Sequence, residues 1–283
     1  MNPFKNILLA VDFTEHSNFT LQSAIHFCQE TKSALSLIHV VSVDGADPKM
    51  EVKLKIGKTK LEKTIKNIQD QGVEVPHTKV VAGNIEKHTM FFADAIKADA
   101  ILIGSGNDHQ NKKHRLGGHA EAILRYSSIP VFILKDTWYP LKGKIACLVD
   151  ISDQSHTVIK TAIDFAKHIS SELVVIHSIE QGPYGFQLTE LGYAYAERNY
   201  YDFQTAPIEN FLKQFDFKGV TWSLKILNGL AKHMISDYII KHPFSMTIMG
   251  SASRTGISRF ILGSVAETIS RNIDSPCLII KSK

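Results

Sequence analysis

The stretch LLAVDFTEHS at residues 8–17 returns as ACLVDISDQS at residues 146–155, 138 positions later. Further along the chain, a second set of matches has an offset of 146. The matched pairs are Val11/Val149, Asp12/Asp150, Ser17/Ser155, Ala24/Ala162, Phe27/Phe165, Leu35/Leu173 and His39/His177, followed by Gly83/Gly229, Gly104/Gly250, Gly117/Gly263, Glu121/Glu267, Arg125/Arg271, Pro130/Pro276 and Lys135/Lys281. A repeat of this length has the size of a domain. Each half is therefore predicted to be a complete domain, and an insertion of eight residues (146 minus 138) in the second half explains the change of offset.

Short apolar runs alternate with helix-like spacing in both halves. Strands are expected at residues 7–11, 35–41, 73–81, 101–103 and 130–134, and again at 145–149, 173–179, 220–227, 247–249 and 276–280. Because strands that alternate with helices form a parallel sheet with right-handed crossovers, the predicted fold class is α/β, with two tandem five-stranded parallel-sheet α/β sandwich domains. The break at DTWYPLKGK (residues 136–144) places these domains at residues 1–137 and 143–283. The short linker predicts that they pack together.

The composition is that of an ordinary globular chain: of 283 residues, 44% are apolar and 21% charged, and the net charge is +4. This small charge is unlike the clustered basic face of a nucleic-acid-binding protein. Cys28, Cys147 and Cys277 have no metal-ligand or redox spacing and are expected to be buried small hydrophobes. The apolar run at residues 7–13 is too short for a signal peptide or a membrane span and contains Asp12. We expect a cytoplasmic protein with no nucleic-acid or membrane partner.

Two features of each half lie where ligands bind in open parallel sheets, beyond the carboxyl ends of the strands. Asp12 and Asp150 end the first strand of each half, and a glycine-containing loop follows the fourth. In the second half this loop is Gly250–Ser264, and Gly250 would let the chain approach a ligand. The loop leads into a helix whose free N–H groups favour a phosphate. Arg254 adds a charged donor.

On these residues, both halves resemble the universal stress protein family in its tandem form. The resemblance rests on the opening VDxSxxS motif, the histidine after strand two and the loop that ends LGSVAE before a helix. The family's nucleotide-binding loop follows Gly-x2-Gly-x9-Gly-Ser/Thr. In the second half Gly250, Gly263 and Ser264 match this pattern, but Ser253 replaces the second glycine. In the first half Gly104 and Gly117 match, whereas Asn107 replaces the second glycine and Gly118 the hydroxyl.

The resemblance implies a Rossmann-like fold of the adenine nucleotide alpha hydrolase type. It also implies that some members bind ATP or AMP, with the strand-one aspartate near the adenosine and the loop on the ribose and phosphates. Mg²⁺ would enter only with the nucleotide. The implied nucleotide-binding residues are Val149, Asp150, Met249, Gly250, Ser253, Arg254, Gly263, Ser264 and Val265, and more weakly Asp12, Gly104, Asn107, Gly117 and Gly118 in the first half.

The expected function is that of a nucleotide-responsive stress or regulatory protein that acts on a protein partner of unknown identity. The alternatives are a nucleotide-free interaction scaffold and a slow ATPase. The sequence holds no Gly-x-Ser-x-Gly elbow, complete Walker loop or His-Glu-x-x-His cluster, so neither an enzyme nor a metal site is predicted. In this family the fifth strand commonly pairs across a dimer interface. The two fifth strands are therefore expected to pair within the chain as a pseudo-dimer, and a homodimer is left open.

Several of these residues also have a purely structural interpretation. Asp12 and Asp150 could instead cap the following helices. His39 and His177 are expected to be hydrogen-bonded core histidines. Residues 112–115 are expected to form a solvated loop, and the aromatic stretch Tyr184–Phe203 to pack against another surface.

Overall fold

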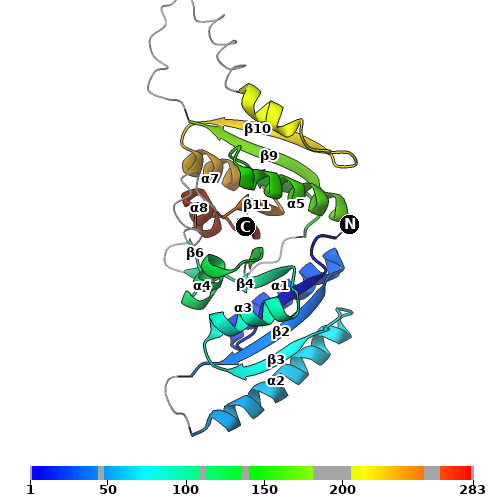
Figure 1. Ribbon diagram of the computed structural model, residues 1–283, viewed down its shortest axis with the longest axis vertical. Helices are drawn as coiled ribbons and strands as arrows, with labels where there is room; N and C mark the ends of the chain where they lie inside the picture. Colours follow the sequence, from blue (N-terminus) through cyan, green and yellow to red (C-terminus); the bar gives the residue numbers. More distant parts are fainter. Residues whose placement is uncertain are drawn as a thin grey trace, which may run out of the picture.

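The computed structural model describes residues 2–43, 48–108, 113–135, 140–180, 205–251 and 262–281 (Figure 1). The first domain contains β1 (Asn6–Ala10), α1 (Glu15–Thr31), β2 (Ala34–Val41), α2 (Met50–Asp70), β3 (Thr78–Ala82), α3 (Ile85–Ala95), β4 (Ala100–Gly104), β5 (Gly106–Asp108), β6 (Lys113–Arg115), α4 (Gly118–Tyr126) and β7 (Val131–Leu134). The second contains β8 (Lys144–Leu148), α5 (Asp153–Ile169), β9 (Glu172–Ile179), β10 (Trp222–Asn228), α7 (Ala231–Lys241), β11 (Met246–Gly250), α8 (Ser264–Asn272) and β12 (Cys277–Ile280). Residues 205–212 are also helical.

Both domains contribute to one ten-stranded sheet, in the order β10-β9-β8-β11-β12-β7-β4-β1-β2-β3. Within this sheet, the strands of each domain pair in parallel, as the alternation of strands and helices predicted. The junction differs, because β7 and β12 run antiparallel with Phe132 opposite Leu278. The expected pairing of the two fifth strands is therefore present, and it joins the halves that lie one above the other in Figure 1.

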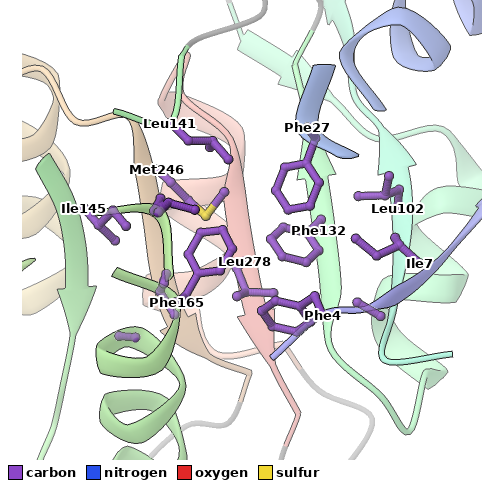
Figure 2. Packing of buried hydrophobic residues seen from close by; sticks show 14 of the residues in the cluster. Phe4, Ile7, Phe27, Leu102, Phe132, Leu141, Ile145, Phe165, Met246 and Leu278 are labelled. Atoms are coloured by element: carbon purple, nitrogen blue, oxygen red, sulfur yellow. The ribbon is translucent and has the colours of Figure 1, made fainter. Parts of the chain in front are cut away.

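Helices cover both faces of the sheet. One apolar core lies under α1, α2 and α5, and the other under α3, α4, α7 and α8; both run across the domain junction. The first core contains an aromatic cluster at the junction (Figure 2). The ring of Phe132 lies 4.6 Å from that of Phe27 and 4.9 Å from that of Phe4, both edge-on, and Phe165 of the second domain lies 6.3 Å away. Edge-to-face packing of this kind adds to the stability gained by burial.

Two expectations about the first domain were wrong. The strand expected at residues 73–81 begins only at Thr78. Gly72 is left-handed (φ 78°) and Pro76 has no N–H, so the preceding segment cannot form a regular ladder. Residues 113–115, expected in a loop, form β6 and pair antiparallel with β5. The aromatic stretch Tyr184–Phe203 lies outside the described residues.

The three cysteines and two histidines have the predicted structural roles. Cys28, Cys147 and Cys277 are buried and unpaired, and burial raises their thiol pKa to about 12, 12 and 11. The Nδ1 atoms of His39 and His177 lie 2.8 Å and 2.9 Å from the carbonyl oxygens of Val11 and Val149. Since a carbonyl only accepts, each Nδ1 carries the proton. In the described part of the chain, no helix combines the length and hydrophobicity needed to cross a membrane.

Each domain also sends one buried lysine into the other. Lys135, which follows β7, donates from Nζ to the carbonyl oxygen of Ser270 in α8 at 2.6 Å. Lys281, which follows β12, donates to the carbonyl of Leu124 in α4. Both carbonyls lie in a last helical turn, where no further N–H of the helix is available. The two lysines therefore act as reciprocal helix C-caps across the junction.

We predict that Lys281 makes the free energy of unfolding depend on pH in the alkaline range. Burial lowers its pKa from 10.5 to about 8, so between these values the unfolded chain binds more protons than the folded one. The contribution of Lys281 to the free energy of unfolding must then increase as pH rises through this window. Relative to Lys281→Met, the wild type should gain about 2 kcal/mol between pH 7 and pH 10. Denaturant unfolding across this range measures the difference. The exposed Lys66→Met is the control, and parallel profiles for wild type and Lys281→Met would contradict the assignment.

Candidate functional site

A cavity of about 240 Å³ opens at the carboxyl ends of β8, β9 and β11 in the second domain. Strand β8 lies between β9 and β11, so the chain passes to one side of β8 and later crosses to the other. Ligands of open parallel sheets bind at such switch points. Of the nine second-domain residues predicted for the site, seven line the cavity: Val149, Asp150, Met249, Gly250, Gly263, Ser264 and Val265. The other two, Ser253 and Arg254, lie outside the described residues.

The cavity wall also contains residues that were not predicted. The polar ones are Ser152, Gln154, Ser155, Ser178 and Glu180, and the apolar ones include Ala231 and Ile235 of α7. The VDxSxxS motif of the second half contains Ser152 and Ser155 and could have identified them. Glu180 matches Ser42 in the first half, so the repeat gave no signal for it.

The carboxylate of Asp150 is fixed through one of its two oxygens. Its Oδ1 accepts hydrogen bonds from the amide of Ser152 at 3.1 Å, the hydroxyl of Ser152 at 2.5 Å and the hydroxyl of Ser155 at 2.8 Å. Ser152, not Asp150, is the N-cap residue of α5. The interpretation of Asp150 as a helix cap was therefore wrong. Among the described residues no donor reaches Oδ2, which leaves that oxygen available to a ligand.

Asp12 has a related arrangement in the first domain. Its Oδ1 accepts from the amide and hydroxyl of Thr14 at 3.0 and 2.8 Å, and Thr14 is the N-cap of α1. Burial raises the pKa of Asp12, but hydrogen bonds from Thr14 and Ser17 outweigh burial and lower it overall. The cap interpretation is therefore wrong for Asp12 too, and the group is anionic.

The N-terminus of α8 also lines the cavity. Gly263 is its N-cap, and no side chain caps the helix. The N–H groups of the first turn, together with Ser264, are thus available to an anion. Gly250 lines the cavity, and its lack of a Cβ also leaves room for a neighbouring side chain. A Cβ there would lie 2.8 Å from Oε1 of Gln154, whose Nε2 donates to the carbonyl of Ile280 at 2.9 Å. This glycine makes room for Gln154.

The first-domain candidates occupy equivalent elements but have different neighbours. A Cβ on Gly104 would lie 2.1 Å from Oγ1 of Thr20, so a threonine fills the space that Gln154 fills in the second domain. Gly117 and Gly118 begin α4 and have open space around them. Asn107 lies in β5, paired with His114, and its side chain is outside the described residues.

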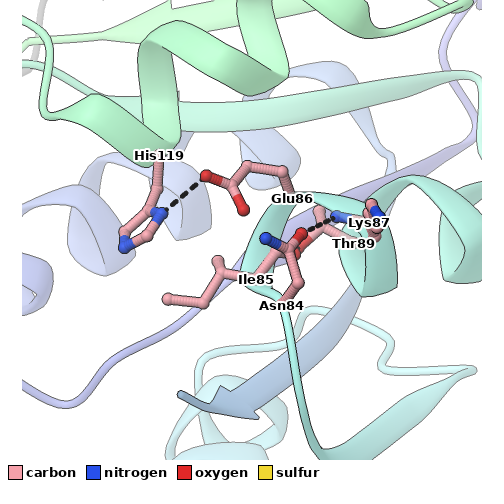
Figure 3. A network of polar contacts seen from close by, with 6 residues as sticks. All are labelled: Asn84, Ile85, Glu86, Lys87, Thr89 and His119. Carbon is pink, nitrogen blue, oxygen red and sulfur yellow. Dashed lines mark hydrogen bonds and ion pairs between the residues drawn. The ribbon is translucent and has the colours of Figure 1, made fainter. Parts of the chain in front are cut away.

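A carboxylate lies beside the N-terminus of α4 (Figure 3). Glu86 of α3 contacts Nδ1 of His119, the second residue of α4, at 2.8 Å. The hydrogen bond from His119 lowers the pKa of Glu86, which is therefore ionised. The matching residues of the second domain are Lys232 and Val265. Glu86 would repel an anion at the N-terminus of α4, whereas the matching residue beside α8 is a lysine.

Comparisons with known proteins agree with this architecture. The family model described as "Universal stress protein family" matches residues 3–135 and again residues 143–281. The chain belongs to the universal stress protein family. A curated universal stress protein of Methanocaldococcus jannaschii is 27% identical over 141 residues, which cover 50% of this chain and 83% of that protein.

Solved structures of the tandem form have the same fold along almost the whole chain. A universal stress protein of Archaeoglobus fulgidus superposes with a TM-score of 0.74 at 19% identity and covers 98% of this chain and 96% of its own. A functionally unknown protein of Pseudomonas aeruginosa superposes with a TM-score of 0.72 at 20% identity, with 98% and 92% covered. The expected Rossmann-like fold with two universal stress protein domains is therefore confirmed, and the chain is a stress-response protein of this family.

Backbone strain follows the strand-one aspartate in both universal stress protein domains. Ile151 (φ 61°) and Phe13 (φ 60°) are left-handed, which is a costly conformation for a β-branched or bulky residue. Because asparagine tolerates this region, Ile151→Asn should raise the free energy of unfolding by about 0.5–1 kcal/mol. Denaturant titration measures the change.

Phe13→Asn is the matched control for this prediction. The Phe13 ring packs 4.5 Å from that of His39 and lies under Nζ of Lys60, so relief of strain there is offset by lost contacts and no gain is expected. A loss of stability in Ile151→Asn would show that its backbone is not strained.

Proposed function

We propose that the second domain binds an adenine nucleotide, ATP or AMP, and that binding regulates the association of this stress protein with a protein partner. The observation that carries the proposal is the cavity, whose wall contains both the Asp150 carboxylate, with Oδ2 unbonded among the described residues, and the uncapped N-terminus of α8. These groups suit the two ends of a nucleotide. A carboxylate accepts from ribose hydroxyls or a base amine, and free helical amides donate to phosphate.

The size of the cavity suits the nucleoside part of the ligand. Its volume of about 240 Å³ lies just below the usual range of ligand pockets, roughly 300–1,000 Å³. Apolar walls from Val149, Ile235 and Met249 can hold a base. The phosphates would then lie against Ser264 and the Gly250–Ser264 loop, where Arg254 supplies a charge. Mg²⁺ would enter with the phosphates. In the described residues no group of three or more His, Cys, Asp or Glu side chains could hold a metal by itself.

The first domain, in this proposal, contributes an interaction surface in place of a second nucleotide site. Glu86 places a negative charge at the N-terminus of α4, and Gly118 lacks the hydroxyl that Ser264 provides. Both differences disfavour phosphate. One nucleotide per chain is therefore the expected stoichiometry, and its arrival would change a partner surface.

Calorimetric titration of the wild type and of Asp150→Ala with ATP·Mg²⁺ and with AMP tests this function. The wild type should bind one nucleotide per chain. Loss of a charged hydrogen-bond acceptor should weaken binding by about 10- to 100-fold. The matched Asp12→Ala should leave the affinity unchanged. Circular dichroism checks that both variants fold, and the pair Gly263→Ala/Ser264→Ala gives an independent readout at the phosphate end.

Two results would contradict the proposal. Absence of heat at millimolar ATP and AMP would favour the nucleotide-free scaffold. Equal losses in Asp12→Ala and Asp150→Ala would show that the domains do not differ as inferred. Release of phosphate at a rate abolished by Asp150→Ala would instead favour a slow ATPase.

A further inference from the structure

The second domain has another concave surface at the amino ends of its strands, on the side of the sheet away from the nucleotide cavity at the carboxyl ends. We call it the amino-end groove, because it lies at the starts of β8, β10 and β11 and at the end of α7. Its volume is about 670 Å³. The residues used below are Lys142, Lys144, Lys225, Tyr238, Phe244 and Ser245, all on its wall.

The groove combines positive charge with an apolar floor. Lys142 and Lys225 are exposed and form no ion pair within the described residues. Nζ of Lys225 lies 5.4 Å above the ring of Tyr238. Lys144 contacts Glu172 at 3.5 Å, and Glu172 lies outside the groove wall. Val174, Leu224 and Phe244 supply apolar surface. Such a surface suits an acidic ligand with an apolar part.

The first domain shows what occupies the matching position there. Asp99 follows α3, and its Oδ2 accepts hydrogen bonds from the amides of Lys5 and Asn6, both at 2.8 Å. Its own amide donates to the carbonyl of Asn6 at 2.8 Å. A carboxylate is thus bound at the start of the first strand, and it satisfies backbone donors that the sheet leaves free.

The second domain keeps two of the backbone hydrogen bonds found in the first domain but has no carboxylate at this position, and its chain differs at Gly143, whose φ is 153°. Ser245 replaces Asp99 at the offset of 146, and its amide still donates to the carbonyl of Lys144 at 2.8 Å. The peptide bond between Gly143 and Lys144 makes the same contact with the second strand as its counterpart in the first domain. The amide of Glu172 donates to the carbonyl of Gly143 at 3.0 Å, and the amide of Ala34 donates to the carbonyl of Lys5 at 2.7 Å. The amide of Lys144 therefore takes the place of the Asn6 amide. No side chain among the described residues accepts from it.

We propose that the amino-end groove binds an acidic peptide segment of a partner protein, one of whose carboxylates takes the position that Asp99 occupies in the first domain. The carboxylate accepts from the amide of Lys144, and Lys142 and Lys225 neutralise further acidic side chains. An apolar residue of the peptide packs on Phe244 and Tyr238. The apolar floor favours a peptide over a small anion, and the net charge of +4 is too small for nucleic acid. The proposal does not depend on nucleotide binding.

The test uses fluorescence anisotropy with a labelled eight-residue peptide of alternating Glu and Leu, amidated at its C-terminus. The comparison peptide has Gln in place of Glu. Ser245→Asp restores the internal carboxylate, and Lys142→Gln/Lys225→Gln removes the charges without adding a competitor. Lys79→Gln is the matched control, because Lys79 lies 5.5 Å above Phe92 in the first domain as Lys225 lies above Tyr238. Thermal unfolding checks that all variants fold.

The acidic peptide should bind at least about tenfold more tightly than the Gln peptide, the loss expected for a charged acceptor. Ser245→Asp and the double variant should each weaken binding about tenfold, and Lys79→Gln should not. Equal affinity for both peptides, or undiminished binding in Ser245→Asp, would overturn the proposal. So would free 4-methylpentanoate binding as tightly as the peptide, because the ligand would then be a small carboxylate.

Discussion

The antiparallel pairing of β7 with β12 is the constraint on which the rest of the structure depends. Each is the last strand of its own domain's parallel sheet, and an unpaired edge there would expose a row of free N–H and C=O groups. Pairing removes both edges and makes one sheet. Because the strands run in opposite directions, the end of β12 comes to the side where α4 ends. Lys281 can then cap α4 and Lys135 can cap α8.

Because the two domains are repeats, matching positions can be compared directly. The backbone features are shared: left-handed Phe13 and Ile151 follow the aspartates, and His39 and His177 make the same bond to a strand-one carbonyl. The differences are in half-buried side chains outside the apolar cores, where a substitution costs little stability. Glu86 matches Lys232, and Asp99 matches Ser245. The domains therefore differ in what they can bind while keeping one scaffold.

The repeat and the apolar periodicity predicted the architecture because buried parallel strands must be apolar and must alternate with helices. They could not predict where a strand loses its ladder, as before Thr78, since that depends on Pro76 and a left-handed Gly72. Motif matching located most of the cavity wall. It missed Glu180, which lies outside the motif, and Gln154, which occupies an unspecified position within it. It also gave no sign that Gly250 leaves room for Gln154. Contacts between distant segments carry no local sequence signal.

The nucleotide cavity and the amino-end groove share elements but no side chain. Strands β8, β9 and β11 contribute their ends to one and their starts to the other, and α7 contributes Ile235 to the cavity and Tyr238 to the groove. The core positions of β8 and β11 are buried, and neighbours bond both strands on each side, so neither can shift alone. Helix α7 packs on the sheet by one face only. If the two ligands influence each other, α7 is the element whose displacement both would sense; with α7 fixed, they bind independently.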